Sequence, residues 1–221
     1  MKRNTLYVLL AAVLACAVMA LVDGVLQPPY ALKSGIKLLL FLGLPLVLSL
    51  CRKDIAYSTL FHFQKKGFLI ALLLGVGIYG LILGAYFIVA NWFDFSGIVG
   101  QLSRNAGVTR DNFLLVSLYI SFVNSLLEEF FFRGFVFTNL KRLHSRKFAY
   151  LFSAAAFSLY HVAMMVGWFS PILFLLVMAG LTAGGMIFNY MNERLNTIYC
   201  SWLTHMFANF AINTIGFLLM A

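Results

Sequence analysis

The chain has 221 residues, of which 62% are hydrophobic and only 10% are charged, and its mean hydropathy is +0.93. Soluble domains carry about 25% charged residues, so this composition excludes an ordinary soluble domain. The net charge of +9 could indicate nucleic-acid binding. We exclude nucleic acid as a partner because the basic residues lie in short segments between apolar runs, which is typical of membrane proteins.

The apolar residues form runs long enough to cross a lipid bilayer. Their ranges are roughly 6–26, 35–51, 67–90, 112–139, 148–166, 169–190 and 198–220. A segment in lipid must satisfy its own backbone hydrogen bonds, so each run is predicted to be helical. The sequence therefore predicts an all-α, polytopic transmembrane helix bundle of about seven to eight spans, forming a single integral membrane domain over residues 1–221. Small residues in the sixth run are interpreted as sites of close helix packing: Gly180, Ala183, Gly184 and Gly185.

The distribution of Lys and Arg predicts the orientation. With a cytoplasmic N-terminus, eleven of the sixteen basic residues lie on the cytoplasmic side and four in outer loops, and Arg133 lies within a span. The four outer residues are Lys33, Lys37, Arg104 and Arg110. This bias favours a cytoplasmic N-terminus. The small size and the lack of a targeting signal beyond the spans favour a multi-pass protein of a prokaryotic plasma membrane.

Three acidic residues fall within the predicted spans: Asp23, Glu128 and Glu129. A carboxylate near the centre of a membrane helix costs about 2.5–3.5 kcal/mol on insertion scales, so a buried one needs an explanation. Asp23 is close to the end of the first span and is interpreted as a solvated helix end. Glu128 and Glu129 are instead deep in the fourth span.

The two glutamates differ in their surroundings along the helix. Glu129 and Arg133 are four residues apart and are predicted to share a face as an ion pair. Glu128 points away from that face and has no cation nearby in the sequence, which suits a general base. The alternative is a buried salt-bridge network that only fixes helix packing. This alternative explains Glu129 and Arg133 but leaves Glu128 unexplained.

Two histidines also fall within spans, His161 in the fifth and His205 in the seventh. A single histidine in a membrane helix often forms only a helix-to-helix hydrogen bond. Together with Glu128, however, these two form a ligand set that zinc accepts in hydrolases. Asn209 follows His205 by one helical turn, so both project from one face. Its amide could stabilise a developing oxyanion or serve only as an interhelical contact.

Three motifs follow one another on successive spans: Glu128-Glu129-xxx-Arg133, Phe157-xxx-His161 and His205-xxx-Asn209. In this order they resemble the CAAX protease and bacteriocin-processing family (CPBP, also called Abi), which includes the Ras-converting CAAX endopeptidases. The motif-bearing stretch, about residues 112–215, is the expected catalytic core.

The resemblance implies an intramembrane endopeptidase that cleaves a membrane-associated peptide or protein. Glu128 and His161 would activate a water molecule, and His205 and Asn209 would bind the oxyanion of the tetrahedral intermediate. The supporting residues would be Glu129, Arg133 and Phe157.

The sequence is compatible with both a zinc-dependent and a metal-free mechanism. Zn²⁺ would be bound by Glu128, His161 and His205. We favour a metal-free glutamate mechanism, because Asn209 beside His205 provides oxyanion donors without an ion and the sequence shows no further carboxylate to orient the histidines.

Two alternative functions are also consistent with the sequence. One is a non-catalytic membrane scaffold or bacteriocin-immunity protein, since the family resemblance includes immunity members. The other is a small proton-coupled carrier, in which Glu128 and the histidines form a relay. Neither the paired repeats nor the broken helices of carriers are apparent in the sequence.

Overall fold

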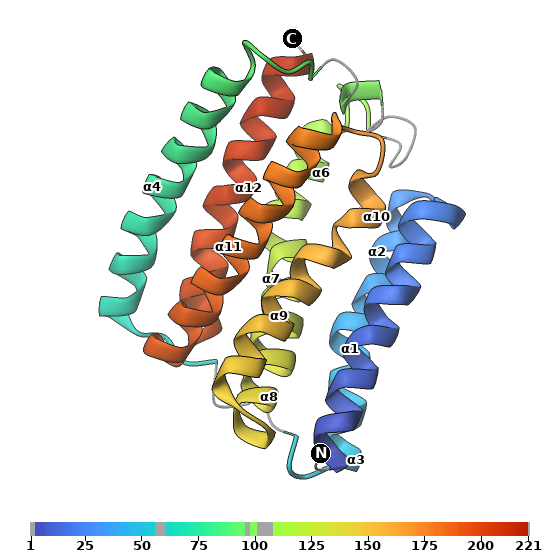
Figure 1. Ribbon diagram of the computed structural model, residues 1–221, viewed down its shortest axis with the longest axis vertical. Coiled ribbons are helices and arrows are strands. Elements are labelled where there is room, and N and C mark those ends of the chain that lie inside the picture. The colour runs from blue at the N-terminus through green and yellow to red at the C-terminus, as the bar shows by residue number, and fades with distance from the viewer. Residues whose placement is uncertain (1–2, 56–60, 96–97, 101–107, 221) are drawn as a thin grey trace.

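A computed structural model describes residues 3–55, 61–95, 98–100 and 108–220 and shows a bundle of long helices (Figure 1). No β-strand occurs in these ranges. Seven helices there are long and apolar enough to cross a membrane. They are Arg3–Leu26, Tyr30–Cys51, Lys65–Val89, Phe113–Leu143, Arg146–Met165, Pro171–Leu195 and Ile198–Met220. The predicted all-α, multi-pass architecture is confirmed.

Several spans alternate between α-helical and wider π-helical turns. The first comprises α1 (Arg3–Leu21) and η1 (Val22–Leu26), and the second comprises α2 (Tyr30–Leu38), η2 (Leu39–Gly43) and α3 (Leu44–Cys51). The fourth comprises α6 (Phe113–Tyr119), η4 (Ile120–Asn124), α7 (Ser125–Glu128), η5 (Glu129–Phe137) and α8 (Thr138–Leu143). The others are α4 (Lys65–Val89), α9 (Arg146–Tyr160) with α10 (Val162–Met165), α11 (Pro171–Leu195) and α12 (Ile198–Met220). Such π-helical turns are uncommon and frequently occur at functional sites.

The helix ends follow local sequence signals. The Ser145 hydroxyl accepts a hydrogen bond from the backbone N–H of Phe148 and caps the start of α9. Pro171 occupies the first turn of α11, where its missing N–H costs nothing. The same helix ends at Asn196, whose φ of 49° is left-handed.

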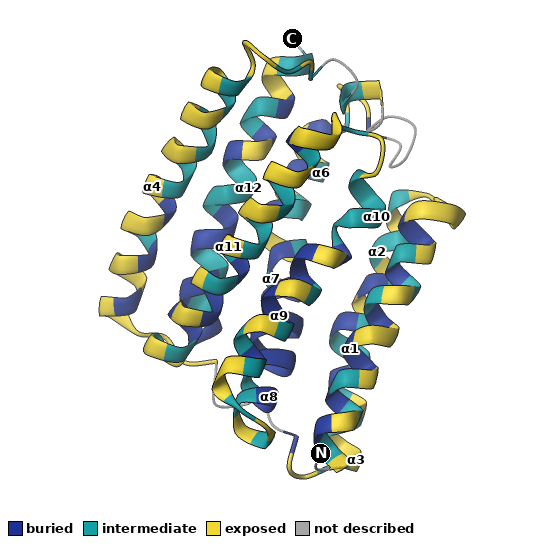
Figure 2. Ribbon diagram, viewed as in Figure 1, coloured by how far each residue is buried: buried dark blue, intermediate teal, exposed yellow. Residues whose placement is uncertain are grey.

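The fourth span lies in the interior of the bundle. It is packed by α9, by α12 and by the N-terminal helix pair, whereas α4 lies along α12 at one edge (Figure 1). The inner faces of these helices are buried, and α4 is exposed along its outer side (Figure 2). Exposed leucines such as Leu73 on α4 and Leu115 on α6 are suited to contact lipid.

A phenylalanine cluster joins the fourth span to the N-terminal pair. Phe131, Phe132 and Phe135 are buried on η5. Phe41 of η2 stacks on Phe131, with their ring centroids 4.3 Å apart. This cluster fixes the second span against the fourth, next to the two glutamates.

Two expectations about single residues are wrong. Asp23 is not a solvated helix end, because it is buried and its Oδ1 lies 2.9 Å from Lys33 Nζ. Among the three glycines singled out in the sixth span, only Gly185 lies close to another helix: a Cβ there would lie 3.1 Å from Ala154 Cα. Gly180 and Gly184 face open space, with nothing within 4 Å of such a Cβ.

Candidate active site

Glu128 is the end of α7, at the point where the fourth span changes from α-helix to π-helix. Its side chain is only 2% exposed, and its two carboxylate oxygens have different neighbours. Oε1 accepts hydrogen bonds from Lys37 Nζ at 2.5 Å and from Asn124 Nδ2 at 3.0 Å. Oε2 lies 3.7 Å from His205 Nε2. Glu128 therefore joins the second, fourth and seventh spans.

The contact with Lys37 corrects the interpretation of Glu128. The sequence shows no cation near Glu128 in the same helix, but the second span supplies one from 91 residues away. Lys37 also donates to Asn124 Oδ1, and its ammonium lies 4.9 Å from the Tyr160 ring and 5.2 Å from the Phe41 ring. Lys37 is buried inside α2 and so is not an outer-loop residue. Lys33 also lies in α2, and Arg104 lies outside the described residues. Of the four basic residues assigned to outer loops, only Arg110 is described outside a span.

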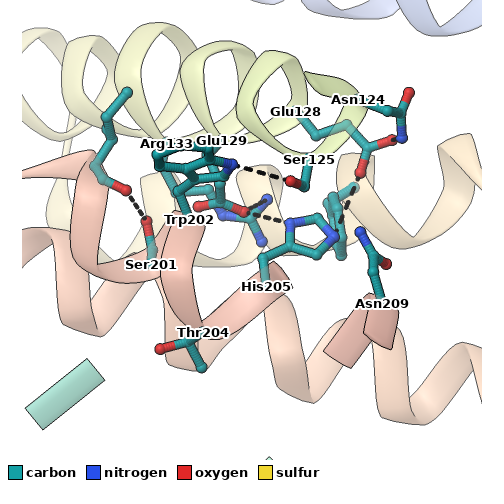
Figure 3. A network of polar contacts seen from close by, with 12 residues as sticks. Asn124, Ser125, Glu128, Glu129, Arg133, Ser201, Trp202, Thr204, His205 and Asn209 are labelled. Carbon is teal, nitrogen blue, oxygen red and sulfur yellow. Dashed lines mark hydrogen bonds and ion pairs between the residues drawn. The ribbon is translucent and has the colours of Figure 1, made fainter. Parts of the chain in front are cut away.

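Glu129 points away from Lys37, toward Arg133 and α12. Its Oε1 lies 3.3 Å from Arg133 Nη1 and 2.9 Å from His205 Nδ1 (Figure 3). The sequence alone indicates no second carboxylate to orient the histidines. Glu129 is such a carboxylate, and this removes one reason for preferring a metal-free mechanism.

Arg133 is completely buried between aromatic rings. Its guanidinium carbon lies 4.2 Å from the centroid of Phe157 and 5.0 Å from that of Phe188. None of its three side-chain nitrogens makes a hydrogen bond, and Glu129 Oε2 makes none either. Arg133 is therefore held by its charge pair and by cation–π contacts.

Phe157 packs between the two intramembrane histidines. Its ring centroid lies 4.9 Å from that of His161 and 5.8 Å from that of His205. Phe188 stacks on His205 at 5.2 Å. These rings restrict how each imidazole can turn.

His161 ends α9, and its ring contacts the last turn of that helix. Its Nδ1 lies 2.7 Å from the Phe157 carbonyl oxygen. Because a carbonyl oxygen only accepts hydrogen bonds, Nδ1 carries the proton and Nε2 keeps a lone pair. In the neutral ring, Nε2 can therefore accept a hydrogen bond.

His205 also has an oxygen acceptor at Nδ1, in this case the carboxylate of Glu129. When its Nδ1 donates to Glu129, a neutral ring offers only an acceptor at Nε2. Nε2 can donate toward Glu128 or a bound oxyanion only when both ring nitrogens carry protons. The two nitrogens face different carboxylates: Nδ1 lies 2.9 Å from Glu129 Oε1 and Nε2 lies 3.7 Å from Glu128 Oε2.

Asn209 extends from the same side of α12 as His205, one turn further along (Figure 3). Its Nδ2 donates to the Ile120 carbonyl oxygen at 3.2 Å. An amide nitrogen has two hydrogens, so one N–H remains for a ligand. The four predicted catalytic residues thus come from three spans: Glu128, His161, His205 and Asn209.

The predicted zinc ligands do not form a metal site in this arrangement. Across the described part of the chain, no three His, Cys, Asp or Glu side chains are placed to hold a metal ion. The ammonium of Lys37 already occupies Glu128 Oε1, and a second cation there would be repelled. Zinc binding by Glu128, His161 and His205 would require these side chains to rearrange.

Comparison with known proteins identifies one family. Residues 110–211 match the family described as type II CAAX prenyl endopeptidase Rce1-like. The match covers a little less than half of the chain and contains all three motifs, so the resemblance seen in the sequence is confirmed over this stretch. It does not include the second span or Lys37. No curated protein and no solved structure matches the chain.

Proposed function

We propose that this membrane protein, whose residues 110–211 form an Rce1-like domain, is an intramembrane endopeptidase that hydrolyses a peptide bond by water activated at Glu128. One observation carries the proposal. The buried carboxylate of Glu128 has one oxygen bound by Lys37 and Asn124, and its other oxygen faces His205 Nε2 across 3.7 Å. A water molecule bound beside that gap would lie within hydrogen-bond distance of both atoms.

In this mechanism Glu128 accepts a proton from the water while the water oxygen bonds to the scissile carbonyl carbon. The carbonyl π electrons move to oxygen and form the tetrahedral oxyanion. When the C–N bond breaks, the proton passes from Glu128 to the leaving nitrogen. His161, with its free Nε2, would share the water and align it.

His205 and Asn209 would stabilise the oxyanion. His205 would donate from Nε2 in its charged form, and Asn209 from its second N–H. Glu129 would hold His205 at Nδ1, 2.9 Å away, and balance its charge. Donors fixed before the reaction need no reorganisation when the oxyanion forms.

The substrate we propose is a membrane-associated peptide or protein, of the prenylated CAAX type or a related one. The residues of the site lie within membrane-spanning segments, where a lipid-anchored chain can be presented. We further propose that the protein resides in a prokaryotic plasma membrane with its N-terminus in the cytoplasm, as the distribution of basic residues favours.

A membrane peptidome comparison tests the proposal. Membranes from cells producing the wild type or Glu128→Gln are analysed by mass spectrometry for peptides that accumulate uncleaved. Glu128→Gln keeps the shape and removes the base, so cleavage should fall by about 10²–10⁴-fold. Full cleavage by Glu128→Gln would refute the role of Glu128.

The ion pair with Lys37 supports one alternative function. It gives Glu128 a structural partner, as expected in a non-catalytic scaffold or immunity protein. If neither protein cleaves any membrane peptide and an immunity phenotype survives Glu128→Gln, the scaffold function replaces the peptidase.

A further inference from the structure

Lys37 belongs to the second span, outside the Rce1-like domain, yet its ammonium lies only 2.5 Å from Glu128 Oε1. Its side chain is only 5% exposed. A lysine inside a membrane segment is costly and needs a partner. Glu128 and Asn124 are the partners here.

The contacts give the two oxygens of Glu128 different roles: one is bound by donors and the other faces the site. The terminal torsion of a glutamate is broad, so an untethered carboxylate can turn either oxygen toward the site. Here both donors, Lys37 Nζ and Asn124 Nδ2, bind Oε1. Lys37 also donates to Asn124 Oδ1, so the three side chains form a closed ring of hydrogen bonds. Oε2 alone is left facing His205.

Lys37 itself is held in place. Its ammonium lies over the rings of Phe41 and Tyr160 at 5.2 and 4.9 Å. Phe41 is in turn fixed by stacking on Phe131 of the fourth span. The charged hydrogen bond from a held lysine is stronger than a neutral one, so this tether dominates the orientation of the carboxylate.

We propose that Lys37 is a positioning residue for peptide hydrolysis: it binds Oε1 of Glu128 so that Oε2 is the oxygen that receives the proton of the attacking water. This inference rests on the proposed function. It makes the N-terminal helix pair part of the hydrolytic site, although that pair lies outside the Rce1-like domain.

The chain supplies a matched control one helical turn away. Lys33 is also a lysine of α2, and it lies 2.9 Å from the buried carboxylate of Asp23. Lys33 and Lys37 lie on the same helix, and each substitution, Lys33→Met or Lys37→Met, removes the ammonium partner of a buried acid. Only Lys37→Met alters the surroundings of Glu128.

The test uses the full-length protein in phospholipid vesicles and a farnesylated CAAX peptide carrying a fluorophore and a quencher on either side of the scissile bond. We expect Lys37→Met to lower kcat by about 10²-fold with little change in KM, because misplacing a reacting group costs about that much. Lys37→Arg, which keeps the charge, should recover part of the rate. Lys33→Met should keep the kcat of the wild type while its melting temperature falls as much as that of Lys37→Met.

Asn124→Leu provides a second variant if Lys37→Met does not fold. It removes the other donor to Oε1 and should lower kcat with KM unchanged, by less than Lys37→Met. Wild-type kcat in folded Lys37→Met or Asn124→Leu would overturn the inference, and so would an equal loss of kcat in the Lys33 and Lys37 variants.

Failure of the proposed function would look different. In that case Glu128→Gln would leave the membrane peptidome unchanged, and no variant would alter cleavage of any peptide. If the wild type cleaves other membrane peptides but not the farnesylated probe, the kcat of each variant relative to the wild type is measured on those peptides.

Discussion

The ion pair of Glu129 and Arg133 allows stability and activity to be separated by substitution. Glu129→Gln would leave the Arg133 guanidinium, which is completely buried, without its anion. Breaking a buried pair by removing one partner costs about 3–5 kcal/mol. For a chain of this size that corresponds to a fall in melting temperature of about 6–20 °C, at about 2–4 °C per kcal/mol.

Activity should respond differently. The amide that Glu129→Gln introduces has an oxygen that can still accept the hydrogen bond from His205 Nδ1. It no longer balances the charge of His205, so the folded protein should keep part of its activity. In the double variant Glu129→Leu with Arg133→Met, no buried charge of the pair is left unpaired and stability should return toward that of the wild type. His205 then has no acceptor at Nδ1, so activity should fall.

The assay combines melting in detergent with cleavage per unit of folded protein. We expect stability and activity to change in opposite directions. Glu129→Gln should be less stable but active, and the double variant should be stable but less active. Two results would refute the reasoning. One is an unchanged melting temperature in Glu129→Gln, and the other is a double variant no more stable than the single one.

Three further predictions concern packing, topology and metal. Gly185→Val should lower stability by about 1–3 kcal/mol, because its Cβ would press on the α9 backbone at 3.1 Å; Gly184→Val, which points into open space, should keep the wild-type melting temperature, and equal effects would contradict this. Cysteines introduced in the 141–147 loop should be labelled only from the cytoplasmic side, and labelling from outside alone would reverse the orientation. A membrane-permeant chelator should leave cleavage intact under the metal-free mechanism, whereas loss of cleavage with recovery on adding zinc would establish a metal enzyme.

The spans could be predicted because hydrophobic length determines them, and the seven predicted ranges correspond to the seven helices observed. The pairing of Glu129 with Arg133 could also be predicted, since their spacing places them on one helical face. The contact between His205 and Glu129 could not, because it joins residues 76 apart and depends on how two helices rotate against each other.

Lys37, like Asp23, has a place in the structure that the sequence predicted wrongly. Lys37 falls near the start of the second predicted range, 35–51, and yet it is counted with the cations of the outer loop. The helix begins at Tyr30, which places Lys37 two turns inside it. A lysine within an apolar run is itself a signal of a buried partner. The π-helical turns on either side of α7, η4 and η5, leave no comparable signal, because hydrophobic periodicity does not distinguish them from α-helical turns.

The separation of Lys37 and Glu128 along the chain has a consequence for biosynthesis. Lys37 leaves the ribosome 91 residues before Glu128, which at about 5–20 residues per second is an interval of about 5–18 seconds. During that time Lys37 lacks Glu128 as a partner for its ammonium, and a lysine near a helix end can extend toward the membrane surface instead. The helix should therefore enter the bilayer in a shallow position and move inward when the fourth helix arrives. Substitutions of Glu128 that remove its charge should then slow the maturation of the N-terminal half, a defect that pulse-chase protease protection of the nascent protein would detect.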